Sequence, residues 1–384
     1  MQQLSNRTAN FTDSVIRRMT RISNQYGAVN LSQGFPDFDP PRAILDRLAQ
    51  VSGEDVHQYS ITWGAQNFRE ALAEKQSHCM GRPVDPNREI VVTCGSTEAM
   101  MAAMMSVTNP GDKVVIFSPF YENYGADTIL SGAEPIYVPL SPPEFRFDPE
   151  VLEDAFRRRP KALVLCNPSN PCGRVFRREE LEVIAGLAAK YDAYVITDEV
   201  YEHIVYAPHQ HTYFAALPGM WERTISCSSL SKTYSITGWR LGYTIAPEEI
   251  SERIKKVHDF LTVGAAAPLQ EAVIPGLRFG RDYYDELLAK YTRKRELFLS
   301  GLDALGLAHN TPEGAYYVLL DISRYGYDSD LAFCEMLARD IGVGAVPGSS
   351  FFREPVNHLI RLHFAKRDET LLDALNRLEG LKKL

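Results

Sequence analysis

The sequence predicts an α/β protein in which a mostly parallel sheet is covered by helices, with a smaller α+β domain after it. From about residue 90, short β-branched runs alternate with amphipathic stretches, which is the rhythm of βαβ units. Runs such as Ala162–Cys166 and Tyr194–Thr197 are apolar on both faces, as expected of strands in a sheet with helices on both sides. After about residue 270 the pattern changes to a long charged helix and a few separated strands.

The predicted elements follow one another in a regular order. The first 50 residues are turn-rich around Gly34–Pro41, so we expect an arm that closes over the functional site. The large domain is predicted to contain helices from Ser96 and Arg178 and strands at Ile90–Cys94, Val114–Phe117, Ile136–Pro139, Ala162–Cys166, Tyr194–Thr197, Thr224–Cys227 and Arg240–Ile245. The small domain is predicted to contain a helix at Asp282–Leu305, strands near Tyr316–Leu320, Gly344–Val346 and Leu359–Phe364, and a helix from Asp368. We place the boundaries at residues 1–45 for the arm and part of the small domain, 46–270 for the large α/β domain, and 271–384 for the small C-terminal α+β domain.

The composition is that of a folded protein and does not indicate a nucleic-acid or membrane partner. The 384 residues are 45% hydrophobic, enough for a large core, and the formal net charge is −8. No basic run is longer than the short Arg157–Arg159, and no window of 18 residues is wholly apolar. The first residues show no basic start followed by an apolar stretch, so we expect a cytoplasmic protein.

The cysteines do not indicate a metal site. The six cysteines, at positions 79, 94, 166, 172, 227 and 334, are scattered, with no close Cys-x-x-Cys pair and no cysteine–histidine cluster. Such a cluster is the usual sign of zinc, so we expect no metal. We interpret most of these residues as free thiols in or beside buried strands.

One lysine carries the strongest chemical signal. Lys232 lies in Ser-Leu-Ser-Lys-Thr-Tyr-Ser, a run rich in hydroxyls, and Arg240 follows eight residues later. A Ser-x-Ser-Lys run alone usually marks an exposed loop. Pyridoxal phosphate (PLP), however, is held on a lysine amine, and its phosphate needs hydroxyls, backbone N–H groups and a permanent cation. Ser229, Ser231 and Arg240 can supply the hydroxyls and the cation, so we predict PLP as the cofactor.

Polar residues also follow several predicted strands, at the edge where open parallel sheets bind their ligands. Gly95, Ser96 and Thr97 open a helix whose N–H groups, hydroxyls and dipole suit a phosphate, although Ser96 is also an ordinary N-cap residue. Asn170 lies in a segment with two Asn-Pro steps, which restrict the backbone and hold the amide in place.

A carboxylate stands at the end of another buried strand. Asp198 ends the run Tyr-Val-Ile-Thr-Asp, a position where a lone aspartate is commonly a structural hydrogen bonder. With PLP present it has a chemical task, because a carboxylate beside the pyridine nitrogen keeps that nitrogen protonated and lets the ring accept electrons. Tyr201, three residues later, could donate a hydrogen bond to the ring hydroxyl.

Across most of its length the chain resembles the class I/II PLP-dependent aminotransferases of fold type I. The motifs that carry this resemblance occur in the family's order: Tyr59-x4-Gly64, Gly95-Ser96-Thr97, Asn170-Pro171-Cys172-Gly173, Asp198-Glu199-Val200-Tyr201, Ser229-x-x-Lys232, Gly238-Trp239-Arg240 and Ile360-Arg361-Leu362. The resemblance implies a large PLP-binding α/β domain and transfer of an amino group between an L-amino acid and a 2-oxo acid in two half-reactions.

The resemblance also implies a role for each matched residue around the cofactor ring. Lys232 is expected to hold PLP and to shuttle the proton, and Asp198 to pair with the ring nitrogen. Asn170 and Tyr201 are expected to flank the ring hydroxyl, and Tyr121 to stack on the ring. Without the resemblance, Tyr121 could equally be a core residue.

Further matched residues are expected to bind the phosphate and the substrate. The resemblance assigns the phosphate to Gly95, Ser96, Thr97, Ser229 and Arg240. It assigns the substrate α-carboxylate to Arg361, with help from Asn170 and the Gly34 backbone. Tyr59, otherwise an ordinary loop aromatic, is expected to reach the phosphate of the neighbouring subunit, which implies a homodimer with shared active sites.

Two departures from the family pattern bear on the substrate. Cys172 stands where many relatives have threonine, and we expect little effect, because Pro171 and Gly173 set the backbone. Thr97 stands where some dicarboxylate-specific relatives have lysine, so a preference for aspartate is weakened.

The arm Leu31–Phe38 resembles the subgroup that handles kynurenine, glutamine, methionine and aromatic amino acids. Phe35, Trp63 and Tyr121 could form an apolar wall for such side chains, or could belong to the core. We therefore expect neutral, aromatic or sulfur amino acids to be favoured over aspartate.

Two alternatives remain open at this point. Lys232, Asp198 and Arg361 would equally serve β-elimination from cysteine conjugates or a specialised biosynthetic PLP reaction on the same fold. A PLP-sensing regulator is the alternative from a different class, but such proteins carry a basic DNA-binding module ahead of this domain. Gly34 lies too near the start for one, so we expect an enzyme.

Overall fold

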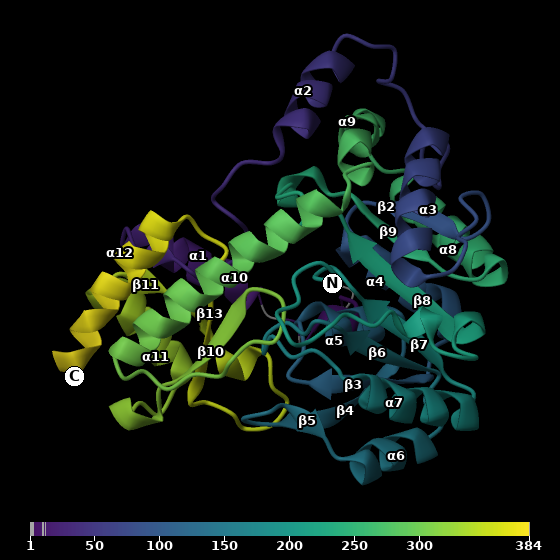
Figure 1. The fold of residues 1–384 in the computed structure, drawn as a ribbon. Helices are drawn as coiled ribbons and strands as arrows, with labels where there is room; N and C mark the ends of the chain where they lie inside the picture. Colours follow the sequence, from purple (N-terminus) through teal and green to yellow (C-terminus); the bar gives the residue numbers. More distant parts are fainter. Residues whose placement is uncertain (1–3, 10, 12, 384) are drawn as a thin grey trace.

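The computed structural model describes residues 4–9, 11 and 13–383. Its largest element is an eight-stranded sheet (Figure 1). The strand order is β2 (Ile90–Thr93), β9 (Gly242–Ile245), β8 (Thr224–Ser229), β7 (Tyr194–Asp198), β6 (Ala162–Cys166), β3 (Lys113–Ser118), β4 (Glu134–Ser141) and β5 (Arg146–Phe147). The strands from β8 to β4 pair in parallel, whereas β9 and β5 run antiparallel to their neighbours. The prediction of a mostly parallel sheet is therefore confirmed.

Helices cover both faces of this sheet. Along β3 the side chains alternate between two cores: Val114 and Ile116 belong to one, and Val115 and Phe117 to the other. The first core is shared with α4 (Ser96–Val107), α5 (Asn123–Leu130) and α8 (Glu248–Thr262), and the second with α6 (Pro149–Arg157) and α7 (Arg178–Tyr191). A strand buried on both faces must be apolar at successive positions, which explains the unbroken apolar runs in the sequence.

A third group of helices packs beside β2 and β9. It consists of α2 (Arg42–Val51), α3 (Gln66–Met80) and α9 (Ala267–Leu277), whose apolar side chains share one cluster. Figure 1 shows α2 at the top, against α9 and away from the rest of the N-terminal segment. The turn-rich arm of the prediction therefore contains two helices, α2 and α1 (Val15–Gln25), that the sequence pattern did not indicate.

The C-terminal part folds around a smaller sheet. Strands β10 (Tyr317–Asp321), β13 (Leu359–His363) and β12 (Val346–Pro347) form a three-stranded antiparallel sheet, and β1 (Val29–Asn30) pairs in parallel with β11 (Val343–Gly344). The helices here are α1, α10 (Arg281–Ala304), α11 (Asp330–Met336) and α12 (Asp368–Leu378). Met19 of α1 packs in the same core as this sheet, which is how the N-terminal segment joins the C-terminal part.

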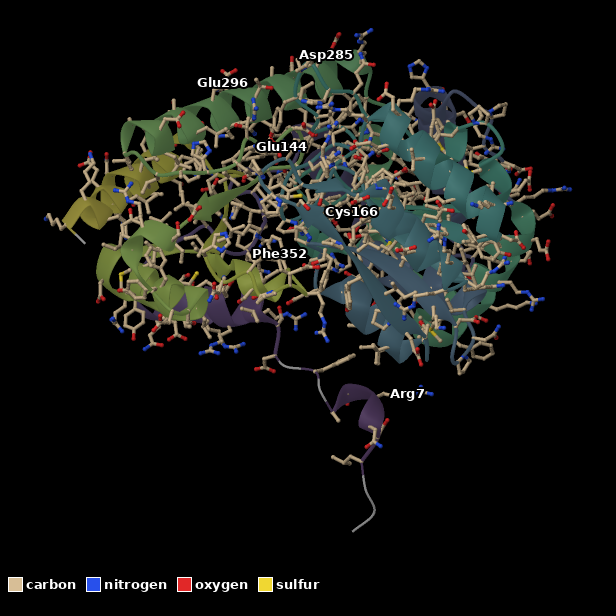
Figure 2. All side chains as sticks on the ribbon, turned by 90° about the horizontal axis from the view of Figure 1, so that it is seen from below. Arg7, Glu144, Cys166, Asp285, Glu296 and Phe352 are labelled. Atoms are coloured by element: carbon tan, nitrogen blue, oxygen red, sulfur yellow. The ribbon has the colours of Figure 1, made fainter. Side chains whose placement is uncertain are left out.

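The long helix α10 runs over the outside of the molecule. Figure 2 shows Asp285 and Glu296 projecting from its outer face, and both residues are exposed. Of the residues that the structure describes, none forms a helix that is both long and apolar enough to cross a membrane.

Several predicted strands differ from the observed ones in their end residues, and two of the differences have a clear structural reason. The strand expected at Arg240–Ile245 begins at Gly242, because Arg240 adopts a left-handed backbone conformation with φ of 55°. The strand expected at Gly344–Val346 is divided: β11 pairs with the N-terminal strand β1, whereas β12 pairs with β13.

Gly242 generates a stability prediction, because β9 passes very close to the turn before α4. A Cβ atom at Gly242 would lie 2.4 Å from the carbonyl carbon of Gly95 and 2.6 Å from the nitrogen of Ser96. Gly242→Ala should lower the free energy of unfolding by about 1–3 kcal/mol, measured by urea titration.

The matched control is Gly186→Ala in α7, where the added methyl group meets no described atom within 4 Å. It should raise the free energy of unfolding by roughly 0.5–1 kcal/mol, because glycine is unfavourable inside a helix. Wild-type stability of the Gly242 variant would contradict the close packing at this turn.

Candidate active site

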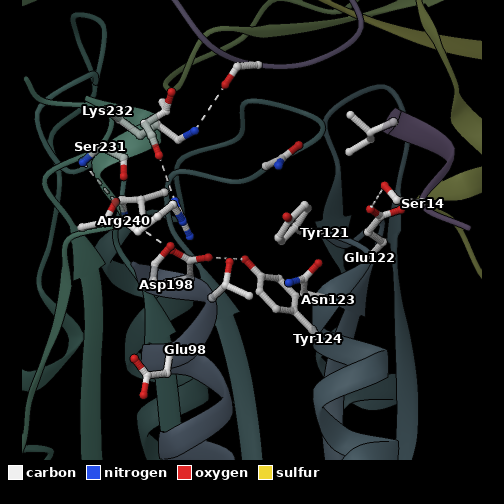
Figure 3. Close-up of a pocket in the computed structure, with 18 of the residues that line it drawn as sticks. Ser14, Glu98, Tyr121, Glu122, Asn123, Tyr124, Asp198, Ser231, Lys232 and Arg240 are labelled. Carbon is white, nitrogen blue, oxygen red and sulfur yellow. Dashed lines mark hydrogen bonds between the residues drawn. The ribbon is translucent and has the colours of Figure 1, made fainter. Parts of the chain in front are cut away.

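A cavity of about 850 Å³ lies at the carboxyl ends of the parallel strands (Figure 3). Residues from both halves of the molecule line it. Of the residues singled out in the sequence, the lining includes Gly34, Phe35, Ser96, Thr97, Tyr121, Asn170, Asp198, Tyr201, Ser229, Ser231, Lys232, Arg240 and Arg361. Because parallel strands end at one edge, residues that are far apart in the sequence meet there.

Lys232 follows β8 and lines the cavity. Its Nζ donates to the carbonyl oxygen of Gly34 at 3.2 Å, and the Tyr316 hydroxyl donates to the same oxygen at 2.9 Å. Burial lowers the pKa of Lys232 to about 8, the Asp198 charge opposes this, and the charges of Arg240 and Arg361 lower it further. A substantial fraction of this amine is thus unprotonated just above neutral pH, as a nucleophile or general base requires.

Among the described residues, Asp198 is the carboxylate whose charge raises the pKa of this amine. It ends β7, where the Tyr124 hydroxyl donates to its Oδ2 at 2.7 Å and the Val200 amide donates to Oδ1 at 3.4 Å. Burial raises the pKa of Asp198, while the hydrogen bonds from Tyr124 and Val200 and the charge of Lys232 act in the opposite direction. Figure 3 shows the Tyr124 ring directed at this carboxylate. The Asp198 carboxylate can therefore bind a positively charged group of a ligand.

A pair of tyrosines lines the cavity beside Lys232. The hydroxyls of Tyr201 and Tyr317 lie 2.9 Å apart, and burial raises the pKa of Tyr201 well above its usual value. Tyr201 therefore stays protonated and can donate a hydrogen bond. The Tyr317 hydroxyl also explains Gly34, since a Cβ at position 34 would lie 2.1 Å from it.

Arg361, on β13, is buried at the other side of the cavity with 1% of its surface exposed. Its Nη1 donates to Asn170 Oδ1 at 2.7 Å and its Nη2 to the Ser32 carbonyl at 2.8 Å. Within the described residues Nε has no hydrogen-bond partner and no acidic group forms an ion pair with the guanidinium. A buried cation without a carboxylate is suited to bind the carboxylate of a ligand.

Gly95, Ser96 and Thr97 form the turn into α4, next to Arg240. Gly95 has φ of 82°, and a Cβ there would lie 2.3 Å from Nη2 of Arg240, so only glycine allows this approach. The first N–H groups of a helix have no partner within the helix. Ser231 is buried, and among the residues described its hydroxyl has no partner. This corner thus offers hydroxyls, free N–H groups and a cation to an anion.

Two predicted site residues lie away from this cavity within one subunit. Tyr59 is 86% exposed, so its side chain points outward rather than into the cavity of its own chain. Trp63 packs beside α8, with Nζ of Lys255 4.8 Å from its ring centroid. Phe35 does line the cavity, with Nζ of Lys366 4.3 Å from its ring, and Tyr121 lies edge-on to Tyr124 with centroids 5.9 Å apart.

Some lining residues were not singled out from the sequence. Tyr124 lies on α5, three residues after Tyr121, which precedes the helix, and this short tyrosine spacing is the sequence signal that could have identified it. Asp127, one turn further, is buried, and burial followed by the charge of Asp198 raises its pKa to about 7. Glu98 and Tyr317 also line the cavity.

In the described part of the chain, no group of three or more histidine, cysteine or acidic side chains is arranged to hold a metal ion. All six cysteines are free thiols, as the sequence predicted.

Comparison with known families and proteins identifies relatives over nearly the whole chain. The family model "Aminotransferase class I and II" matches residues 26–378. A methionine aminotransferase of Escherichia coli is 38% identical over 369 residues, covering 96% of each chain. The human kynurenine–oxoglutarate transaminase 1 is 34% identical over 398 residues, covering 94% of each chain.

Solved structures give the same result for the fold. The N-succinyldiaminopimelate aminotransferase of Mycobacterium tuberculosis superimposes with a TM-score of 0.95 at 35% identity, over 99% of this chain and all of the other. The expectation of an aminotransferase fold of type I is therefore confirmed.

The lowered pKa of Lys232 gives a testable pH dependence. In the cofactor-free protein, an amine-directed reagent should modify Lys232 with a midpoint at about pH 8, because only the unprotonated amine reacts. Peptide mass spectrometry would follow Lys232 separately from exposed lysines, which titrate at about pH 10.4.

Asp198→Asn is the control for this prediction, since the Asp198 carboxylate raises the pKa of Lys232. The variant should move the midpoint below pH 8. A wild-type midpoint like that of exposed lysines would contradict the electrostatic description of the cavity.

Proposed function

The chain belongs to the class I and II aminotransferase family, and from that premise we propose which of its residues carry the reaction and which amino acids it prefers. The family establishes the enzyme as a PLP-dependent aminotransferase that acts on amino acids and 2-oxo acids. The observation that carries the assignment of residues is the grouping of Lys232, Asp198 and Arg361 around one cavity.

The residues of the cavity fit PLP. Lys232 offers an amine with a lowered pKa, and Asp198 offers a carboxylate. A phosphate could bind at the turn at Gly95, next to Arg240 and Ser231. Among the residues described, the Ser231 hydroxyl has no hydrogen-bond partner and is therefore free to donate to it. When bound, PLP supplies a protonated pyridine ring that accepts the electrons released as a bond to the substrate Cα breaks.

The proton transfer is assigned to Lys232. Once released from the cofactor, its amine can take the proton from the substrate Cα, since the cavity keeps its pKa close to neutral pH. Asp198 is assigned to hold the protonated ring nitrogen, and the Tyr124 hydroxyl fixes the orientation of its carboxylate. Tyr201 and Asn170 are assigned to the ring hydroxyl, and Tyr121 to the face of the ring.

The substrate α-carboxylate is assigned to Arg361. Asn170 and the Ser32 carbonyl hold two of its nitrogens, so the guanidinium is fixed in direction before the substrate binds. The contact between Lys232 and the Gly34 carbonyl places the arm next to the amine. Substrate can therefore be oriented with its Cα near the base, under an arm that excludes water.

We propose a preference for neutral, aromatic or sulfur amino acids over aspartate. The phosphate turn has Thr97 in place of a lysine that could meet a side-chain carboxylate, and Phe35 and Tyr121 add aromatic surface to the cavity. Relatives that act on methionine and kynurenine support the same choice. Trp63 does not line the cavity of its own subunit, so Phe35 and Tyr121 carry this proposal.

We also propose a homodimer with shared active sites. Tyr59 and Phe260 are 86% and 91% exposed, respectively, which is unusual for aromatic side chains unless another surface covers them. Their two segments are joined by a hydrogen bond of 3.4 Å from the Thr62 hydroxyl to Asp259. Leu261, half of whose surface is exposed, lies between this patch and the cavity. A second copy on this patch would bring Tyr59 towards the neighbouring cofactor site.

The cytoplasm is the proposed compartment. All six cysteines are free thiols, and several are buried side by side with apolar groups. Free thiols of this kind persist in a reducing environment, which the cytoplasm provides.

The function is tested by incubating the PLP-loaded enzyme with each of the twenty amino acids and a 2-oxo acid. We expect a new amino acid that depends on the acceptor, with methionine, glutamine or aromatic donors at least about tenfold better than aspartate in kcat/KM. One mismatched group in a substrate pocket commonly costs this much. Pyruvate and ammonia formed without an acceptor would indicate β-elimination instead.

In the same assay Arg361→Met should lower kcat/KM for every amino acid by roughly 30- to 5,000-fold, or about 2–5 kcal/mol. Arg278→Met, an exposed arginine outside the cavity, is the control and should leave kcat/KM unchanged. Equal activity of the Arg361 variant, or activity towards amines without a carboxylate, would contradict the assignment.

The dimer is tested by Phe260→Glu, which places a charge in the exposed apolar patch. The wild-type mass in solution should be twice that of one chain, and the variant should dissociate at micromolar concentration and bind PLP more weakly. Glu249→Gln, an exposed change at the start of the same helix, should leave the mass at two chains. A wild-type monomer with full activity would exclude the shared site.

A further inference from the structure

His258 is a fully buried residue that the proposed reaction does not use. It lies on α8 with none of its surface exposed, and it joins two other segments. Its Nε2 lies 2.9 Å from the carbonyl oxygen of Thr62, and its Nδ1 lies 2.6 Å from Oε1 of Glu98. The imidazole thus connects the segment that follows Tyr59 to the first turn of α4.

Glu98 lies at the phosphate-binding corner of the cavity. It is the third residue of α4, two positions after Ser96, and it lines the cavity. Its Oε2 accepts from the Cys94 amide at 2.5 Å, and its Oε1 accepts from the Thr262 hydroxyl at 3.0 Å. Burial raises the pKa of Glu98, but hydrogen bonding and charge from His258, then the bonds from Cys94 and Thr262, outweigh burial and lower it.

The hydrogen-bond partners determine the charge on the ring. The Thr62 carbonyl can only accept, so Nε2 must carry a proton. The Thr262 hydroxyl also lies 3.1 Å from Nδ1, but the 2.6 Å contact between Nδ1 and the Glu98 oxygen requires a proton between these two atoms. Glu98 accepts from the Cys94 amide and the Thr262 hydroxyl, which favours the ionised carboxylate, so we assign that proton to Nδ1. With both nitrogens donating, His258 is an imidazolium, and it forms a neutral pair with Glu98.

In the part of the chain that the structure describes, no other charged group neutralises Glu98, because its only ion pair there is with His258. Lys255, one turn earlier on α8, is engaged by Glu252 and the Asn87 carbonyl. Asp259 accepts from the Thr62 hydroxyl, and the Arg240 guanidinium lies against Gly95 without an ion pair to Glu98 among the described residues. The Cys94 thiol faces the Gly264 carbonyl, and burial raises its pKa, so it carries no charge.

An unpaired carboxylate here would oppose the binding of a phosphate. Glu98 takes up part of the positive end of α4 and would place a like charge beside the turn at Gly95–Thr97. We propose that His258 is a positioning residue that neutralises Glu98, and that this pairing lets the N-terminus of α4 accept a phosphate dianion. The proposal rests on the proposed function, because it takes this turn as the phosphate site of PLP.

The test uses the cofactor-free protein and two probes that do not react with Lys232. Pyridoxamine 5′-phosphate carries the phosphate, and pyridoxamine is the same ring without it. Dissociation constants would be measured by fluorescence titration for the wild type, Glu98→Gln, His258→Gln and the double variant. In Glu98→Gln, the glutamine amide can still bond the Cys94 amide and a neutral imidazole, so the hydrogen bonds survive without the charge.

His258→Gln should weaken binding of pyridoxamine 5′-phosphate by about 10- to 100-fold, the factor for like charges several ångströms apart at an effective dielectric of about 20. The double variant should recover to within about threefold of Glu98→Gln, because the uncompensated charge is gone. Pyridoxamine should change by less than about threefold in every variant. Rescue by a second substitution is not expected from a residue that only fills space.

Lys255→Gln is the matched control, since it removes a cation from the same helix that does not bond Glu98. It should change the affinity for pyridoxamine 5′-phosphate by less than about threefold. If His258→Gln fails to fold, the test rests on Glu98→Gln alone. Binding of pyridoxamine 5′-phosphate that is equal to or tighter than that of the wild type supports the proposal, and a tenfold loss of affinity overturns it.

Other results would overturn the inference while leaving the function intact. One such result is an equal loss of affinity for both probes in His258→Gln. The other is a double variant in which the losses of affinity of the two single variants add. If the wild type binds neither probe, the assignment of the cavity to PLP fails first, and with it the proposed residue roles. The two failures are therefore distinguishable.

Discussion

The amine of Lys232 is held in a cavity where, among the described residues, the guanidinium groups of Arg240 and Arg361 and the carboxylate of Asp198 affect its charge. Burial and the two arginines favour the unprotonated amine, and Asp198 alone opposes them. In the proposed assignment the same groups have further tasks: Arg240 binds the phosphate, Arg361 the substrate carboxylate and Asp198 the ring nitrogen. Binding the cofactor and activating the lysine thus depend on one electrostatic arrangement.

The sheet brings these groups together. Gly95, Tyr121, Asn170, Asp198 and Lys232 follow β2, β3, β6, β7 and β8, respectively, at or just beyond the edge of one sheet. Arg361 comes from the smaller sheet, and Gly34 from the arm between α1 and α2. The cavity is thus formed by both parts of the molecule. The glycines at 34, 95 and 242 lie where a side chain would clash with a neighbouring residue. The geometry of the cavity therefore depends on close packing as well as on charge.

Much of this arrangement could be predicted from the sequence, because the strands are continuous apolar runs and the polar residues directly follow them. Pairs that meet through tertiary packing could not be predicted in the same way. Tyr124 reaches Asp198 across 74 positions, and His258 reaches Glu98 across 160, with no local motif for either contact. The division of Gly344–Val346 depends on where the N-terminal strand β1 lies, which the local pattern does not contain. Trp63 could have been part of a substrate wall or of the core, and within one subunit it packs beside α8 with Lys255.

The most direct measurement of the central claim is to load the purified protein with PLP, reduce it with borohydride and map the modified peptide by mass spectrometry. The electrostatics of the cavity predict a yellow protein and one stable adduct, located on Lys232 and absent from Lys232→Ala. A colourless protein, or an adduct spread over exposed lysines with none at position 232, would contradict the assignment.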